Sequence, residues 1–398
     1  MPPDRAPSFL DAYTRDLTQA DLQRLFTRDT ADAYRYFTRH VDARKLAAEP
    51  WYRRWPIQIR LVFSGFTMRL SPARRALYAV GVVSSLLGAI LLFRGFAPVR
   101  LFLFPFTIAV PLPNWVDGAV WLMIGFVAVN LLILMEVADR LSLKGELEIA
   151  RDIQLAMLPA GLRHAGDAVI YGVTRPANTV GGDFYDIIPL PDGRLVLALG
   201  DVAGKGSPAA LLMALLLAML RTLVDEGLEA ARLIERLNVQ VAKHSPASRF
   251  ITFFYALYDP RTGDLQFVNA GHLPPFLLRA DGRLESVAGS TGSGLALGMF
   301  DHATYATNRV TIEPGDLLVL YTDGITEAEN RSGKAFEDAG LEAVVRRMAA
   351  NDPGQIGDAI LAAVIDYAAD ARLGDDLTAL VLKRGAPVTP VSNGAAGL

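Results

Sequence analysis

The pattern of apolar and polar positions divides the chain into a region of long apolar runs and a region of short ones. Residues 76–93 and 118–135 are each 18 residues long and contain no charged side chain. A run of about 18 apolar residues is close to the minimum length for a membrane-spanning helix. The two runs therefore predict a pair of transmembrane helices in a membrane region at 76–135, in preference to a buried pair of core helices.

The segment between the two runs is apolar but is interrupted by Pro105, Pro111 and Pro113. Proline removes a backbone donor, and hydrocarbon offers no other hydrogen-bond partner for the groups that this exposes. We therefore interpret residues 99–116 as a loop, a re-entrant segment or an interfacial segment, with a third span as the remaining alternative.

Basic residues are distributed unevenly around these runs. Residues 1–75 contain 14 basic and 8 acidic residues, a net charge of +6, whereas the connection between the runs contains only two basic residues, Arg94 and Arg100. The positive-inside rule then places both ends of the membrane region on the cytoplasmic side. Residues 1–75 are interpreted as an N-terminal cytoplasmic helical region.

The segment at 136–160 continues the second run as a predicted signalling helix. A 4-3-4-3 spacing runs through Leu143, Leu147, Ala150, Gln154 and Met157. This spacing is typical of a coiled-coil seam, although it covers only about two heptads. An amphipathic helix that packs on the following domain is the alternative.

Short β-rich runs dominate residues 161–385. They are separated by Asp-Gly or Thr-Gly turns at 192–193, 262–263 and 281–282, and helical stretches are predicted at 208–225, 228–244, 338–349 and 354–370. Hairpin-type strands with segregated helices indicate an α+β layer fold. The last residues, 386–398, are interpreted as a flexible tail.

Composition narrows the possible chemistry. The chain contains no cysteine, which excludes a disulfide scaffold, an Fe–S cluster, a cysteine zinc site and a thiol nucleophile. The net charge of −3 conceals the basic N-terminal segment and a net charge of −10 over residues 146–398. These charges do not favour nucleic acid as a partner.

Four acidic motifs stand next to β-rich runs and are flanked by glycine. They are Gly-Gly-Asp183, Asp201-Val-Ala-Gly, Thr-Asp323-Gly and Gly-Asp375-Asp376. Clustered carboxylates favour hard cations such as Mg²⁺ or Mn²⁺, and two such ions can activate water and clamp a phosphoryl group. The alternative for each single motif is an ordinary turn.

Several runs occur in an order that resembles one protein family. They are RDIQLAMLP, RPANTVGGDFYD, GDVAGKGSPAALLMA, FITFFYALYD, NAGHLPPFLL, IEPGDLLVLYTDGITEA and GDDLTALVL. Together they resemble the SpoIIE/RsbU group of PPM-type (protein phosphatase 2C-like) serine/threonine phosphatases over residues 148–384. The resemblance implies a β-sandwich of two antiparallel sheets flanked by helices within 161–385.

The resemblance also implies a site with two Mn²⁺ or Mg²⁺ ions. The implied metal ligands are Asp183, Asp201, the backbone carbonyl of Val202, Asp323, Asp375 and, as an alternative to Asp375, Asp376. Among these, Asp201 is expected to bridge the two ions. Asp183, Asp201, Asp323 and Asp375 are the implied catalytic residues, and they would support attack of activated water on a phosphoserine or phosphothreonine.

Three further side chains each allow two interpretations. Lys205 and Arg175 are candidates to bind the substrate phosphate, or they are ordinary surface cations. His272 is either a candidate acid or a structural residue. The structural interpretation follows from the resemblance, because related eukaryotic enzymes carry their proposed acid histidine at the position of Ala203 instead.

The sequence as a whole predicts a metal-dependent phosphoprotein phosphatase tethered to the cell inner membrane, with a cytoplasmic catalytic domain. By family resemblance, the expected substrate is a phosphorylated STAS-type anti-anti-sigma regulator in a partner-switching pathway, and the expected assembly is a homodimer. The alternatives are a non-catalytic membrane-anchored scaffold and a phosphohydrolase of small molecules.

Overall fold

The computed structural model describes residues 67–385, except 69, 95, 104, 114, 246–248, 290–293 and 370–372. The predicted helical region at 1–75 lies almost entirely outside the described residues, as does the predicted tail at 386–398. The chain forms two compact units, residues 1–141 and residues 142–398, and the boundary falls within one long helix.

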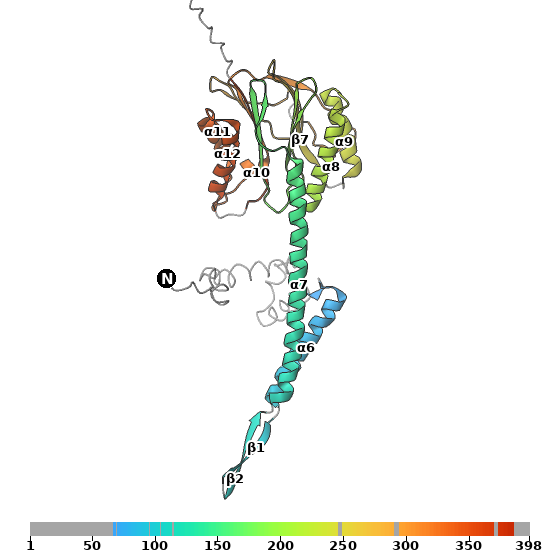
Figure 1. Cartoon of the computed structure of the whole chain (residues 1–398), viewed down its shortest axis with the longest axis vertical. Coiled ribbons are helices and arrows are strands. Elements are labelled where there is room, and N and C mark those ends of the chain that lie inside the picture. Colours follow the sequence, from blue (N-terminus) through green and yellow to red (C-terminus); the bar gives the residue numbers. More distant parts are fainter. Residues whose placement is uncertain are drawn as a thin grey trace, which may run out of the picture. The chain divides into compact units, whose positions relative to one another are not determined.

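The N-terminal unit contains both predicted apolar runs. Helix α6 is Pro72–Arg94, and helix α7 begins at Trp115 and ends at Met157 (Figure 1). Both are long and apolar enough to cross a membrane, judged by length and composition. The predicted runs at 76–93 and 118–135 lie inside these helices, and α7 continues without a break into the predicted signalling helix.

The segment between the two helices is a β-hairpin, which the sequence did not predict. Strands β1 (Phe96–Leu103) and β2 (Phe106–Pro113) pair in antiparallel register, with Pro98 opposite Pro111. A two-stranded ribbon tolerates proline because each strand has one edge on which a missing N–H breaks no ladder bond. The prolines therefore interrupt a helix here but not a hairpin.

Small residues bring α6 and α7 into close contact. A Cβ atom added to Gly88 would lie 2.7 Å from the backbone nitrogen of Leu122, and one added to Gly125 would lie 2.2 Å from Ser85 Oγ. Small residues allow such an approach between the backbones of membrane helices, where dispersion drives association. Arg74 pairs with Asp139 at 2.7 Å and adds an ionic contact between the two helices.

We expect Gly88→Leu to destabilise the helix pair by at least about 1–3 kcal/mol, because the new side chain overlaps the backbone of α7. Unfolding of the full chain in detergent, followed by circular dichroism during titration with SDS, measures this. Gly145→Leu is the matched control, since no atom lies within 4 Å of a Cβ at that position. Equal stability of the two variants would contradict the close packing.

The C-terminal unit is a sandwich of two antiparallel sheets. The six-stranded sheet has the order β10-β9-β12-β13-β4-β3, and the five-stranded sheet has the order β11-β8-β7-β6-β5. The strands of the first sheet are β3 (Arg163–Ala165), β4 (Ala168–Arg175), β9 (Phe276–Leu278), β10 (Leu284–Ser286), β12 (Leu317–Tyr321) and β13 (Leu377–Arg384). Those of the second are β5 (Phe184–Pro189), β6 (Leu195–Val202), β7 (Ile251–Asp259), β8 (Asp264–Ala270) and β11 (Asn308–Thr311).

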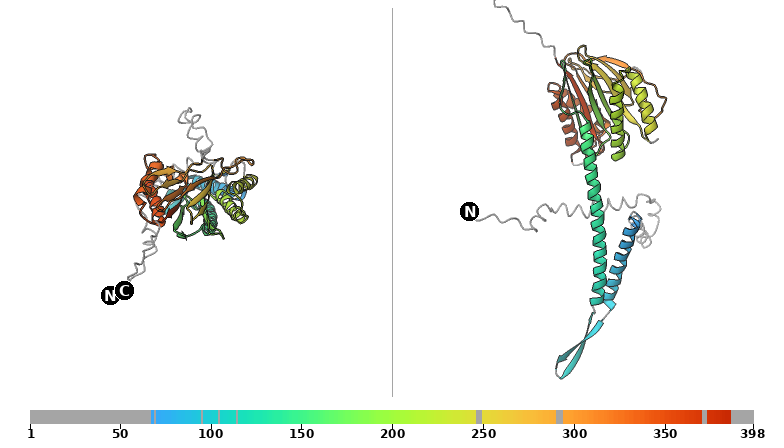
Figure 2. Two further views of the ribbon diagram at one scale, coloured as in Figure 1. Left: turned by 90° about the horizontal axis from the view of Figure 1, so that it is seen from above. Right: turned by 45° about the vertical axis from the view of Figure 1, so that its right-hand side comes forward.

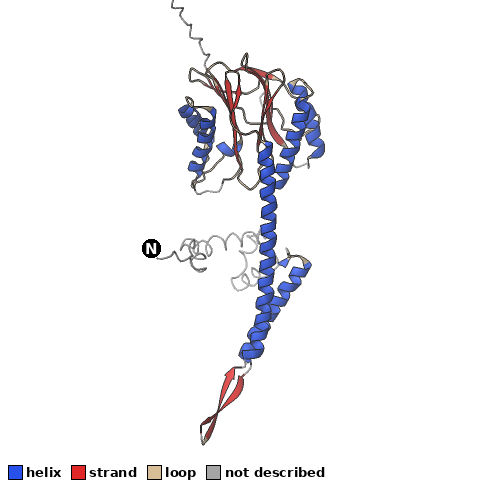
Figure 3. Cartoon of the chain, in the orientation of Figure 1, coloured by secondary structure: helices blue, strands red, loops and turns tan. Residues whose placement is uncertain are grey.

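Helices cover the outer faces of both sheets (Figures 1, 2 and 3). Helices α8 (Ser207–Val224) and α9 (Ala230–His244) pack on the five-stranded sheet. Helices α11 (Glu337–Met348) and α12 (Pro353–Ala368) lie together on the other side, where α12 packs on the six-stranded sheet. The single turn α10 (Asp323–Thr326) follows β12 directly. The predicted α+β sandwich with flanking helices is confirmed.

Helix α8 is a third helix that length and composition alone would allow to cross a membrane. It buries Leu216, Leu217 and Leu220 completely in the core that it shares with the five-stranded sheet. An all-round apolar helix is buried either in lipid or in a large core. Its packing assigns α8 to the core of the sandwich.

The end of α7 is fastened to the sandwich. Gln154 is buried, and Arg221 on α8 donates to the carbonyl of Met157 at 2.6 Å. Two positions of the predicted coiled-coil seam, Gln154 and Met157, therefore lie against the domain of the same chain. The exposed apolar positions of this part of α7 include Ile149 and Ile153 instead. The alternative of an amphipathic helix packed on the next domain describes residues 150–157 better.

Candidate active site

The four acidic motifs come together at one end of the sandwich. Asp183 directly precedes β5 and Asp201 lies near the end of β6, and these two strands pair side by side. In the other sheet, Asp323 follows β12 and residues 375–376 precede β13, which are again paired neighbours. In each sheet, antiparallel pairing therefore places the start of one strand beside the end of its neighbour, at the same end of the sandwich.

Asp376 holds the Gly-Gly-Asp loop across the two sheets. Its carboxylate accepts N–H bonds from Ala177 and Gly182, both at 2.7 Å, and a longer one from Asp183 at 3.5 Å. The side chain is buried, with 6% of its surface exposed. These bonds occupy Asp376 with the loop, so the geometry favours Asp375 over Asp376 as the candidate ligand.

The two glycines of this loop are required by close approach. A Cβ on Gly181 would lie 2.4 Å from Asp376 Oδ2, and a Cβ on Gly182 would lie 2.9 Å from the carbonyl oxygen of Val202. A Cβ atom less than about 3 Å from such an oxygen would be closer than normal packing allows. The absence of side chains thus lets the loop reach both the carboxylate that holds it and the carbonyl of Val202.

Asp183 is almost completely buried and is oriented from the opposite sheet. The hydroxyl of Thr322 donates to Asp183 Oδ2 at 2.7 Å, and Thr322 in turn accepts the N–H of Thr378 at 3.2 Å. Burial raises the pKa of Asp183 well above its ordinary value, and the nearby Asp201 carboxylate raises it further. A buried carboxylate with an acidic neighbour is costly in its charged form unless a cation compensates it.

Burial and neighbouring carboxylates also disfavour the charged forms of Asp201 and Asp323. Burial raises the pKa of Asp201 to about 7, with repulsion from Asp323 as the next cause. The pKa of Asp323 is also raised, first by burial and then by Glu327 and Asp375. Like charges held together in this way are the usual arrangement at a site that binds cations or moves protons.

This arrangement predicts a pH dependence for the chelator-treated protein. The pKa of Asp201 rises from 3.8 in the unfolded chain to about 7 in the folded protein, so the folded state binds this proton more tightly. The resulting stability is fully present below about pH 4 and is lost as the pH rises through about 7, with a maximum of about 4 kcal/mol. We expect the melting temperature in EDTA to fall between pH 5 and 8.

Thermal unfolding of the wild type and of Asp201→Asn across this pH range measures the effect. The asparagine variant lacks the titrating carboxylate, so its melting temperature should change less with pH. A wild-type melting temperature that rises from pH 5 to 8 in EDTA would contradict the assignment.

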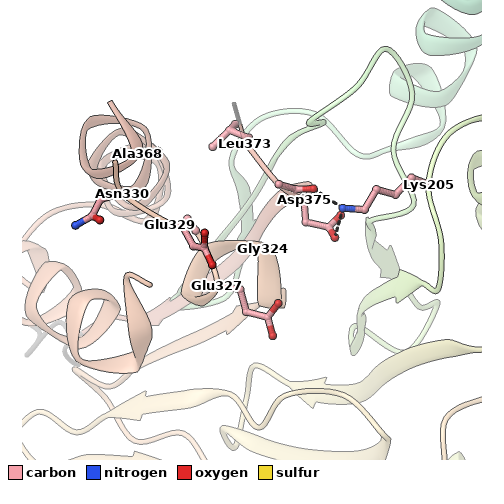
Figure 4. Close-up of a pocket in the computed structure, with 10 residues that line it drawn as sticks. Lys205, Gly324, Glu327, Glu329, Asn330, Ala368, Leu373 and Asp375 are labelled. Atoms are coloured by element: carbon pink, nitrogen blue, oxygen red, sulfur yellow. Dashed lines mark hydrogen bonds and ion pairs between the residues drawn. The ribbon is translucent and has the colours of Figure 1, made fainter. Parts of the chain in front are cut away.

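Lys205 and Asp375 form an ion pair in the wall of a cavity. The Lys205 ammonium lies 2.9 Å from Asp375 Oδ2 and also donates to the carbonyl of Gly374 (Figure 4). Both residues line a cavity of about 400 Å³, whose wall also includes Glu327 and Glu329 (Figure 4). The pKa of Lys205 is raised, mainly by its bond to Asp375. The cavity therefore opens directly beside the acidic cluster.

The donor set fits hard divalent cations. Carboxylate and backbone carbonyl oxygens are the ligands preferred by Mg²⁺, and Mn²⁺ suits the same donors. Within the described part of the chain, no three acidic or histidine side chains already form a complete metal-binding group. The fit therefore rests on the oxygen donors and on the buried negative charge, not on a finished coordination shell.

Three residues of the site make contacts that were not predicted from the sequence. Gln154 on α7 donates to the carbonyl of Gly181 at 2.7 Å and accepts its N–H at 3.1 Å. Thr322 orients Asp183, and Glu327 lines the cavity and acts on Asp323. Thr322 and Glu327 lie in the same run as Asp323, IEPGDLLVLYTDGITEA, which was a usable signal, but nothing in the sequence links Gln154 to residue 181.

Comparison with known proteins agrees with this architecture. Residues 191–385 match the family described as stage II sporulation protein E (SpoIIE). Protein IcfG of Synechocystis is 30% identical over 288 residues, which cover 64% of this chain and 44% of that protein. Phosphoserine phosphatase RsbU of Bacillus subtilis is 29% identical over 243 residues, which cover 61% of this chain and 71% of RsbU.

The chain thus spans less than half the length of the first of these relatives. Among solved structures, the SiaA-PP2C domain of Pseudomonas aeruginosa has a TM-score of 0.54 at 23% identity, covering 62% of this chain and 98% of that domain. This similarity concerns the fold. The family match over residues 191–385 and these relatives show that the C-terminal domain of this chain is similar to the SpoIIE/RsbU group of PPM-type phosphatases, and the solved structure agrees with its fold.

Proposed function

We propose that this chain is a membrane-anchored, metal-dependent protein serine/threonine phosphatase. The observation that carries the proposal is the convergence of Asp183, Asp201, Asp323 and Asp375 at one end of the sandwich, beside an open cavity. The phosphoserine phosphatase name of its relative RsbU supports the same activity.

Two Mn²⁺ or Mg²⁺ ions would be held by Asp183, Asp201, the Val202 carbonyl, Asp323 and Asp375. When bound, such ions activate water and neutralise charge on the transferring phosphoryl group. Asp201 would lie at the centre of this ligand set, since its carboxylate is buried and close to carboxylates of the opposite sheet. Asp376 would contribute indirectly, because its hydrogen bonds hold the Gly-Gly-Asp loop that carries Asp183.

The remaining polar groups of the site would bind and orient the substrate. The cavity beside Asp375 is large enough for a side chain and part of a peptide backbone. Lys205 lines this cavity with its ammonium group, where it could exchange its bond with Asp375 for one with a phosphate oxygen. Phosphate binding by lysine as a point charge is common in proteins.

The anchor in this proposal is the pair of apolar helices α6 and α7. Their length and hydropathy support two spans, and the basic residues near Arg74 support a cytoplasmic location for both ends at the inner membrane. Exposed Ile149 and Ile153 on α7 support association with a second copy of the chain. The proposed client is a phosphorylated STAS-type regulator, by family resemblance.

The decisive experiment measures phosphate release by the full chain in detergent, with Mn²⁺, from a phosphorylated STAS protein and from p-nitrophenyl phosphate. We expect turnover of the phosphoprotein that EDTA abolishes and Mn²⁺ restores. Activity that survives complete metal removal would contradict the mechanism. Binding of the phosphoprotein without turnover would favour a scaffold, and turnover of the small molecule alone would favour a small-molecule phosphohydrolase.

Gln154 connects α7 to the Gly-Gly-Asp loop, so we propose that α7 relays a signal to the site. We expect Gln154→Ala to lower kcat by about 10–100-fold, because the loop that carries Asp183 loses two hydrogen bonds from outside the metal set. Steady-state kinetics on a phosphoprotein measures this. Arg151→Ala, an exposed position one turn earlier, is the control, and equal activity of the two variants would contradict the relay.

A further inference from the structure

His272 lies between the two sheets, close to the acidic cluster but outside it. It follows β8 in a short turn, in which Asn269 Oδ1 accepts the His272 N–H at 2.8 Å and Asn269 Nδ2 donates to the His272 carbonyl at 3.0 Å. Only 4% of the surface of His272 is exposed. The turn thus directs the imidazole into the interior.

Both ring nitrogens of His272 are bound to other parts of the protein. Nε2 lies 3.1 Å from the carbonyl oxygen of Tyr321, and Nδ1 lies 2.9 Å from Thr252 Oγ1. A carbonyl oxygen can only accept, so Nε2 carries the hydrogen and Nδ1 accepts from the threonine hydroxyl. Burial lowers the pKa of His272 to about 4, which keeps the ring neutral near pH 7.

The two partners of the imidazole belong to different sheets, and each stands beside a candidate metal ligand. Thr252 on β7 pairs directly with Asp201 on β6. Tyr321 is the last residue of β12 and precedes Asp323 by two positions. One rigid ring therefore joins the strand next to Asp201 to the strand that leads into Asp323.

We propose that His272 is a positioning residue, a strut between the sheets that sets the spacing of Asp201 and Asp323 and thereby the affinity of the site for divalent cations. This inference rests on the proposed metal-dependent function. A role as a proton donor to substrate does not fit the contacts, since the ring is buried and each nitrogen is already engaged.

An imidazole suits this position because its two nitrogens lie on different sides of a flat ring, one as donor and one as acceptor. His272→Leu fills a similar space but leaves the Tyr321 carbonyl and the Thr252 hydroxyl without this partner. His272→Gln restores one donor and one acceptor on a flexible chain. Thr252→Val removes only the contact to the five-stranded sheet.

The test is Mn²⁺ binding to the chelator-treated full chain in detergent, measured by isothermal titration calorimetry well below the melting temperature. We expect His272→Leu to weaken binding by about 10–100-fold, as for other groups that orient metal ligands, and His272→Gln to recover part of the loss. Thr252→Val should weaken binding to a smaller extent, and it tests the strut independently if His272→Leu does not fold.

Asn238→Leu is the matched control. Asn238 is also fully buried and bridges two backbone groups, the N–H of Gly298 at 2.9 Å and the carbonyl of Phe300 at 2.8 Å, but these lie away from the acidic motifs in sequence. It should lower stability without changing Mn²⁺ affinity.

Unchanged Mn²⁺ affinity in His272→Leu and in Thr252→Val would overturn the positioning role. Equal weakening in Asn238→Leu would overturn it too, because general destabilisation would then explain the effect. A wild-type chain that binds no Mn²⁺ would contradict the metal-dependent function itself, which the wild-type titration distinguishes from a failure of the strut alone.

Discussion

Replacing Asp201 by asparagine is expected to lower kcat/KM on a phosphoprotein by about 10²–10³-fold. Metal ions supply several kcal/mol of transition-state stabilisation, and each 1.36 kcal/mol corresponds to a factor of ten in rate. Asp201 stands at the centre of this effect, because its carboxylate is influenced by Asp323 and Asp375 from the opposite sheet. Phosphate release at saturating Mn²⁺ measures the loss.

The fold should survive this substitution. Asparagine has nearly the same shape and removes one of several repelling charges, so the melting temperature in EDTA at pH 8 should stay equal or rise. Asp192→Asn, an exposed turn residue paired with Arg194, is the control for loss of one acidic charge. Wild-type activity of Asp201→Asn in a folded protein would remove Asp201 from the metal set.

Gly181→Ala is expected to damage stability and activity together. Its Cβ would lie 2.4 Å from Asp376 Oδ2, so either the loop or the carboxylate must move. Overpacking of this kind costs about 1–3 kcal/mol, and a displacement of about 1 Å near a reacting centre can lower the rate by about 10²-fold. Chemical denaturation gives the change in free energy of unfolding, and kinetics with Mn²⁺ gives the change in rate.

Gly145→Ala makes the same chemical change where no atom lies within 4 Å of the new Cβ. It sits inside α7, so it should leave activity unchanged and raise helix stability by about 0.5–1 kcal/mol. A Gly181→Ala variant as stable and active as Gly145→Ala would show that the loop does not need the close approach to Asp376.

The sandwich strands were predictable where apolar runs are bounded by turns. The run at 250–259 and the turn at 262–263 correspond to β7 and its connection to β8. Strand β5 was not predicted, because it begins directly after Gly-Gly-Asp183 and contains Asp186 and Pro189, so no uninterrupted apolar run marks it. Functional motifs at strand ends make the strands harder to predict, because glycine and aspartate lower the β-propensity of the segment that contains them.

The choice between Asp375 and Asp376 as a metal ligand depends on tertiary contacts. The two residues are neighbours of identical chemistry, so no local pattern separates them. Tertiary structure does, since Asp376 points to the N–H groups of Ala177 and Gly182, nearly 200 residues earlier, and Asp375 points to Lys205 at the cavity. The same holds for His272, whose two partners lie on strands of different sheets.

The sequence by itself determined the apolar helix pair, the α+β class and the acidic residue types, because periodicity, composition and turn chemistry are local properties. Only the tertiary structure decided the hairpin at 96–113, the burial of α8 in the core and the contact of Gln154 with Gly181. These features depend on which distant backbone groups meet. Proline, an apolar helix or a glutamine can satisfy several environments, and only packing selects one of them.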